Sequence, residues 1–143
     1  MASKNMLLAH QNPSSRRFVT LHDDGTSAWL YLTEPDSRKP CGDAWVYNRI
    51  PAPPKCEIAR YRGGPPPAAR EYAATSALCK APSSHEWSFA WSCDGEAVAL
   101  LKDDAPVAFI IAGTKGGYSR ELVKDGPWGH PWSSKLYKTT FEP

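Results

Sequence analysis

The sequence of 143 residues lacks a long hydrophobic run, which limits its relation to membranes. Its longest apolar stretch, residues 105–112, is interrupted by Pro106, whereas a membrane-spanning helix needs about 20 apolar residues. Near the N-terminus only residues 6–9 are apolar, which is shorter than the core of a secretory signal peptide, about 7–15 residues. We therefore expect a cytoplasmic protein that has no membrane partner.

A strong net charge is also missing, because 17 Lys and Arg against 15 Asp and Glu leave +2. Net charge alone therefore does not favour a polyanionic partner. Basic residues concentrate only in residues 49–70, and we interpret this stretch as a solvated surface. The alternative is a site for single-stranded nucleic acid, in which phosphate contacts and base stacking would come from Arg49, Arg60, Arg62 and Tyr61.

Closely spaced metal ligands are absent. The four cysteines lie 15, 23 and 14 residues apart and form no Cys-x-x-Cys pair: Cys41, Cys56, Cys79 and Cys93. The spacing of small zinc sites is thus missing, and we predict no metal or cofactor. In a cytosolic chain we expect free and mostly buried thiols, whereas a secreted chain would allow two disulfides of undefined pairing.

The familiar catalytic motifs are missing too, including the Walker loop, GxGxxG, GxSxG and HExxH. His22 stands beside two aspartates, but these are expected at a turn. Cys41 would need a distant histidine to act as a nucleophile, and residues 113–117 lack the first glycine of a phosphate-binding loop. The sequence therefore favours a protein without enzyme activity but does not decide the question.

The chain is rich instead in proline (14) and tryptophan (six). Its apolar fraction of 41% is enough for one modest core, so we predict a single domain over residues 1–143. Within it we expect an N-terminal arm at 1–15, a Pro-rich basic loop at 51–67, and a Trp-containing C-terminal tail at 127–143 that packs on the sheet.

Alternating apolar residues around Asp-Gly pairs predict two groups of antiparallel strands. The first group comprises residues 17–21, 27–33 and 43–50, and the second comprises 86–93, 96–102 and 106–112. Residues 106–112 are almost wholly apolar, which is typical of a strand covered on both faces. We expect an α+β fold dominated by antiparallel sheet, with about six strands, forming an open sheet or a small, partly open barrel.

Other segments show weaker signals. Residues 68–79 have helical spacing after Pro67, and residues 119–125 have a capping serine and a closing glycine, so both are predicted as helices. Residues 56–61 are predicted as a short edge strand, and residues 135–141 as a last extended piece.

Two aromatic groups are candidate binding sites. The first is a stripe along two predicted strands: Trp29, Tyr31, Trp45 and Tyr47, together with Arg49. These residue types are enriched at binding hot spots, but large aromatic side chains also build the cores of small domains. The second group would form a pocket between the sheet and the C-terminal tail, lined by Trp87, Trp91, Trp128 and His130. For both groups a place in the core is the competing interpretation.

The leading hypothesis is therefore a non-enzymatic binding protein that uses the aromatic strand face or the Pro-rich basic loop, with another protein or a second copy as partner. The alternative is a small-molecule-binding protein or small enzyme that uses the second aromatic group. Small Trp-rich α+β proteins without catalytic motifs include toxin-neutralising immunity proteins, so an immunity-type role follows by analogy of class, and no motif carries it.

Overall fold

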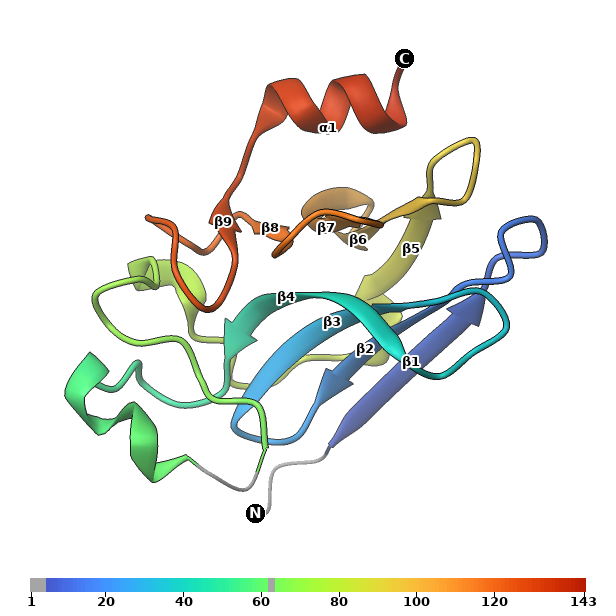
Figure 1. Cartoon of the computed structure of the whole chain (residues 1–143). Coiled ribbons are helices and arrows are strands. Elements are labelled where there is room, and N and C mark those ends of the chain that lie inside the picture. The colour runs from blue at the N-terminus through green and yellow to red at the C-terminus, as the bar shows by residue number, and fades with distance from the viewer. Residues whose placement is uncertain (1–4, 62–63) are drawn as a thin grey trace.

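A computed structural model describes residues 5–61 and 64–143, and these form two β-sheets that pack face to face (Figure 1). The four-stranded sheet has the order β1-β2-β3-β4, from strands Met6–Gln11, Phe18–Asp23, Ser27–Thr33 and Pro40–Asn48. The five-stranded sheet has the order β5-β6-β7-β8-β9, from strands Trp87–Trp91, Ala97–Lys102, Ala105–Ile111, Tyr118–Ser119 and His130–Pro131. Three 3-10 helices (η1 Lys55–Arg60, η2 Thr75–Ala77, η3 Ser84–Glu86) and the helix α1 (Ser134–Phe141) complete the described chain.

The predicted mostly β fold with few short helices is confirmed, but its details differ. The described residues form nine strands instead of about six, in two stacked sheets and no closed barrel. The second sheet is mixed, because β8 and β9 run parallel. The added strands are short or lie at sheet edges, where few apolar residues mark them in the sequence.

The turns of both hairpin groups form as their residues predict. Gly25 and Gly95 have positive φ angles of 92° and 71°, which glycine adopts without steric cost. Asp103 and Asp104 also have positive φ, 50° and 67°, as a two-residue turn between antiparallel strands requires.

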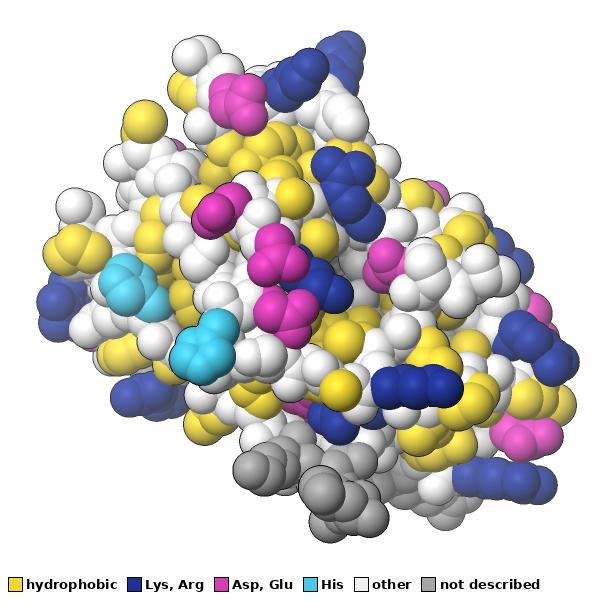
Figure 2. Space-filling view, turned by 180° about the vertical axis from the view of Figure 1, so that it is seen from behind, with side chains coloured by type: hydrophobic (Ala, Val, Ile, Leu, Met, Phe, Trp, Pro, Cys, Tyr) yellow, Lys and Arg dark blue, Asp and Glu magenta, His cyan; other side chains and the backbone are white. Residues whose placement is uncertain are grey.

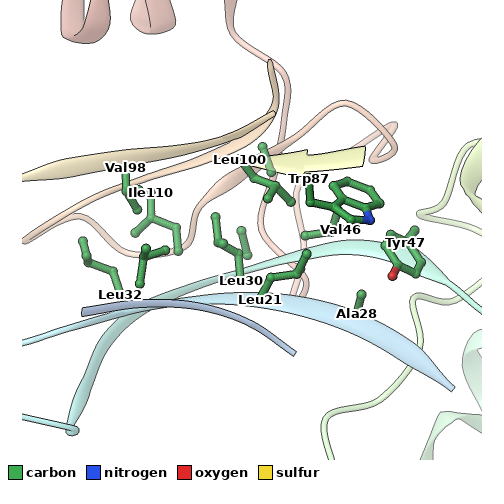
Figure 3. Close-up of a cluster of buried hydrophobic side chains, with 13 residues drawn as sticks. Leu21, Ala28, Leu30, Leu32, Val46, Tyr47, Trp87, Val98, Leu100 and Ile110 are labelled. Carbon is green, nitrogen blue, oxygen red and sulfur yellow. The ribbon is translucent and has the colours of Figure 1, made fainter. Parts of the chain in front are cut away.

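The inner faces of the two sheets form the main core (Figure 3). Aliphatic side chains from β2, β3 and β4 meet those from β6 and β7, and these members are fully buried: Val19, Leu21, Leu30, Leu32, Val98, Leu100 and Ile110. Tyr47 and Trp87 close one end of this core, with stacked rings whose centroids lie 5.5 Å apart.

Helix α1 covers the outer face of the second sheet (Figure 1). Phe109 on β7 is fully buried, and its ring lies 5.8 Å from the rings of both Tyr137 and Phe141 on α1. Trp132, just before the helix, contacts the same ring edge-on at 5.2 Å. Strand β7 is therefore covered on both faces, as its apolar sequence predicts.

Two irregular segments, one between β4 and β5 and the other between β8 and β9, cover the outer face of the first sheet. Residues 64–74 and 122–128 bury Trp29 and Trp45 there. The predicted helix over 68–79 is wrong: only the short η2 forms, because this backbone bonds to other parts of the fold. The described chain has a bridge between Ala73 and Leu122 and another between Leu78 and Asn48. These tertiary partners override the helix propensity of alanine.

Four further predictions are corrected. Residues 56–60 lie in η1, whose turns close locally after two prolines, and Tyr61 is its C-cap, so the predicted edge strand over 56–61 does not form. Ser119 belongs to β8 and residues 120–125 form turns and a bridge instead of the predicted helix over 119–125, because their backbone bonds across to residues 72–74. Residues 135–141 lie in α1, where spacing of i, i+4 places two rings on Phe109. The predicted arm contains β1, because Met6 and Leu8 pack on the core; residues 1–4 lie outside the described part.

All four cysteines lie in the described part and are free thiols. Cys41 and Cys79 are half-buried, whereas Cys56 and Cys93 are exposed, so the expectation of mostly buried thiols is wrong for two of them. Within residues 5–61 and 64–143, the one α-helix has eight residues and no helix meets the length and apolarity of a membrane span.

Candidate functional site

The aromatic stripe is largely interior. Trp29, Trp45 and Tyr47 are buried. The first two lie beneath the irregular segments that cover the first sheet, and the third lies in the main core. These three side chains therefore do not form a surface in this structure, since the chain itself supplies their cover. Tyr31 remains half-buried, stacked on Trp29 with ring centroids 6.5 Å apart.

Arg49 belongs to a buried network. Its Nη1 donates to Asp23 Oδ2 at 2.9 Å, and the hydroxyl of Tyr47 donates to the same oxygen at 2.6 Å. Burial and the bond to Asp23 raise the pKa of Tyr47 far above its usual range, so the phenol stays protonated. This arrangement stabilises the β2–β3 end of the sheet and leaves the Arg49 head group little access to a phosphate.

The other residues named for a nucleic-acid site follow one another in the chain, at the end of η1 and just after it in sequence. Arg60 is exposed at the end of η1 and its Nη1 lies 3.5 Å from Glu57 Oε1; Tyr61 is half-buried; and Arg62 lies outside the described residues. Figure 2 shows that acidic and basic side chains are interspersed with hydrophobic ones on the face behind Figure 1. Charges of both signs therefore lie near one another on this face.

The predicted aromatic pocket is dispersed. Trp87 stacks on Tyr47, and Trp91 donates from Nε1 to His10 Nδ1 at 3.0 Å at the sheet edge. Trp128 is buried against Tyr72 in the outer layer of the first sheet. Of the four residues, only His130 lines the cleft described next.

A cleft of about 560 Å³ opens where the start of β4 meets two glycine-containing loops. Its lining includes the segment 40–43, the loop 114–116, the residues 126–127 and 129, and His130. The loops are held to β4 by backbone bonds: Gly117 N donates to Asp43 O at 2.8 Å, and His130 N donates to Gly117 O at 2.8 Å. Gly129, with φ of 125°, allows this approach, because a Cβ there would stand 2.6 Å from Gly117 O.

His130 links two loops at the rim of the cleft through its two ring nitrogens. Its Nδ1 lies 2.6 Å from Asp125 Oδ1 and its Nε2 lies 2.9 Å from the backbone oxygen of Lys115. Both neighbours are acceptors, so only the protonated ring donates to both. The bond to Asp125, with a smaller contribution from the Lys115 carbonyl, raises the pKa of His130 above its usual value. With both nitrogens engaged, the ring is not placed to act as a general base.

Two further groups of the cleft titrate. Asp43 is accessible at the cleft, yet the surrounding protein desolvates its carboxyl and raises its pKa. Burial raises the pKa of the Cys41 thiol, although Arg17 Nη1 lies 3.3 Å from its sulfur and opposes the shift. The thiol is therefore protonated at neutral pH and is a poor nucleophile. Within the described residues, no three His, Cys, Asp or Glu side chains come together as metal ligands.

The second feature of note is the outer edge of the first sheet. In the described chain, β1 pairs with β2 alone, and its other edge carries no strand (Figure 1). Met6 and Leu8 face the main core, whereas Leu7 is 67% exposed. The other exposed large hydrophobic side chain of the described residues is Val123, in a loop, at 58%.

Sequence reasoning missed both features as sites, although it noted parts of the cleft. Cys41 and the glycine loop at 113–117 lie far apart in the sequence. No local pattern indicates that they line one cleft together with His130. Strand β1 has only six residues and lies in a polar stretch, so its pattern is too short to separate it from an arm.

Comparison of the chain with protein-family models, with curated proteins and with solved structures finds no match.

Proposed function

We propose that this chain is a non-enzymatic interaction protein, and that its docking site is the outer edge of β1, where a strand of a second copy adds to the four-stranded sheet. The observation that carries the proposal is the combination of an unpaired edge with an exposed Leu7. An uncovered strand edge offers a row of backbone donors and acceptors to another strand.

The composition of β1 supports this proposal. Its sequence, MLLAHQ, contains no Lys, Arg, Asp, Glu or Pro, which are the residues that commonly protect edge strands. The hydrogen bond from Trp91 Nε1, at the end of β5, to His10 Nδ1 is made by a side chain of β1, so it leaves the backbone edge of β1 unpaired among the described residues. The free edge of β1 is thus uncharged, with an apolar side chain on its outer face.

The same composition favours a second copy as the occupant. Two β1 strands that run antiparallel about a two-fold axis at Leu8 bring no like charges together. In this register Leu7 lies opposite Ala9 of the second copy, and Leu8 lies opposite Leu8 of the second copy. The two sheets then continue as one sheet of eight strands.

The chemistry of the cleft agrees with a role without catalysis. The Cys41 thiol is held protonated by burial, and both nitrogens of His130 face acceptors. Neither group has the activation that nucleophilic catalysis requires.

Sedimentation velocity over a concentration series tests the proposal. We expect a species of twice 15.8 kDa that dissociates on dilution. Leu7→Lys should weaken this dimer about 10-fold or more, because it places a charge in an apolar pair. Val123→Lys, which changes the other exposed apolar side chain, should leave it unchanged.

A charge pair tests the register. Ala9→Glu alone should also weaken the dimer, and combining it with Leu7→Lys should recover part of the affinity, because each lysine then faces a glutamate of the other copy. A chain that is monomeric at every concentration, or one whose dimer responds equally to Val123→Lys, overturns the proposal.

A further inference from the structure

The cleft beside β4 carries an inference independent of the strand edge. We propose that it binds a small zwitterion, with the ligand's ammonium group held by Asp43 and its carboxylate by Lys115. The volume of about 560 Å³ lies within the range of small-molecule sites, about 300–1,000 Å³.

The state of Asp43 is the first support. Three other aspartates of the fold pair with a basic side chain: Asp23 binds Arg49, Asp36 binds Arg16, and Asp125 binds His130. Within residues 5–61 and 64–143, the carboxylate of Asp43 has neither a hydrogen bond nor an ion pair. Desolvation raises its pKa, so the ionised form lacks compensation. A ligand ammonium group supplies the missing donor and charge.

Lys115 is the second support. It lines the same cleft and, among the described residues, its ammonium group forms no salt bridge. Its backbone oxygen is already bound by His130, which fixes the position of the loop. A cation alone would be attracted by Asp43 and repelled by Lys115, whereas a zwitterion satisfies both charges.

The other titratable groups near Asp43 contribute little net charge at neutral pH. Burial, with the charges of Asp43 and Asp24, raises the pKa of Tyr31 on the adjacent strand to about 12, so its phenol is neutral. Cys41 is protonated, and the His130 ring faces the Asp125 carboxylate, with Nδ1 2.6 Å from Oδ1. Asp43 and Lys115 are therefore the unbalanced charges of the lining.

The experiment is an NMR titration of the full chain with the series from glycine through 4-aminobutyrate to 6-aminohexanoate. We expect at least one member to shift the resonances of Asp43 and Lys115 in a saturable manner. Butylamine and butyrate, which each carry only one of the two charges, should bind at least about 10-fold more weakly. Asp43→Asn and Lys115→Ala should each lower affinity about 10-fold or more. Asp104→Asn, at the opposite end of β7, should leave it unchanged.

The pH dependence provides a second measurement. Affinity should fall as the pH drops through the raised pKa of Asp43, because protonation removes the charge that holds the ammonium group. Asp43→Asn should abolish this dependence.

The proposal is overturned if none of the amino acids shifts these resonances, if Asp43→Asn binds like the wild type, or if butylamine binds as tightly as the zwitterions. The same titration on Leu7→Lys distinguishes a failure of this proposal from a failure of the strand-edge proposal. Leu7→Lys should leave ligand binding unchanged, because β1 contributes no residue to the lining of the cleft.

Discussion

The two outer faces of this sandwich are both covered by the chain itself, but in different ways. Irregular backbone covers the first sheet and buries Trp29 and Trp45, whereas helix α1 covers the second sheet and buries Phe109. The peptide groups of irregular backbone lack the regular hydrogen-bond partners of a helix or sheet. A helix, in contrast, pairs most of its peptide groups through its own hydrogen bonds. The two covers should therefore depend on different interactions.

In the first cover, one buried side chain satisfies the irregular backbone. Asn48 Oδ1 accepts from Ala68 N and from Trp45 Nε1, both at 2.9 Å, and its Nδ2 donates to Ala68 O at 3.0 Å. Trp29 Nε1 adds a bond to Pro66 O at 3.1 Å. This cover is specified by directed hydrogen bonds.

The second cover is held by rings. Phe109 contacts Tyr118, Trp132, Tyr137 and Phe141, with centroid distances of 4.7, 5.2, 5.8 and 5.8 Å. Ser133 caps the helix by accepting from Leu136 N at 3.2 Å. Apolar packing tolerates a substitution that changes the shape of a side chain better than a hydrogen-bond network tolerates the loss of one partner.

The largest effect should come from Asn48→Leu. It leaves the Trp45 indole N–H and both peptide groups of Ala68 without partners, so we expect unfolding in urea to show a loss of about 3–5 kcal/mol. A loss below about 1 kcal/mol would mean that the cover does not depend on Asn48.

Phe109→Leu is the matched change in the second cover. It removes ring contacts but leaves no polar group unpaired, so we expect a loss of about 1–2 kcal/mol. The same urea measurement applies. If this variant is destabilised as much as Asn48→Leu, the distinction between the covers fails.

Phe141→Ala should have a smaller effect of about 1 kcal/mol, because Phe141 is only half-buried. We also expect hydrogen exchange to rise in α1 and to stay unchanged in residues 66–73, since the helix detaches locally. Lys138→Ala, exposed on the same helix, is the control. Equal acceleration in both covers would contradict this expectation.

The smallest effect is the pH dependence of His130. Its folded-state pKa is raised, so its stabilising contribution is fully present below its unfolded value, about 6.5, and is lost as the pH rises through the higher folded value. Asp125 is 74% exposed, so we expect under about 1 kcal/mol. Urea unfolding of His130→Gln should differ from wild type at pH 5.5 and less at pH 8.5, while His85→Gln should match wild type at both.

Several strands were predictable because their signals are local. Asp-Gly turns and alternating apolar residues define β2, β3, β5 and β6, and the apolar run of β7 indicates cover on both faces. The helix predicted at 68–79 failed because its peptide groups bond to Asn48 and Leu122, which are distant in sequence. Residues 135–141 were the opposite case: the extended prediction was wrong because they lie in α1, whose eight residues of mixed polarity give no clear period.

The candidate sites were less predictable than the strands. Trp29 and Trp45 have the composition of a binding face, and only the irregular cover makes them core. The cleft joins Asp43, Lys115 and His130 from three separate segments, so no window of sequence contains it.

Local signals are enough to predict antiparallel hairpins around an apolar, Trp-rich core, because turn chemistry and side-chain alternation act between neighbouring residues. Which aromatic faces are covered, where the edge of β1 stays open, and that Asp43 and Lys115 line one cleft became clear only from the folded chain. Those outcomes depend on contacts between residues tens of positions apart, which local patterns do not record.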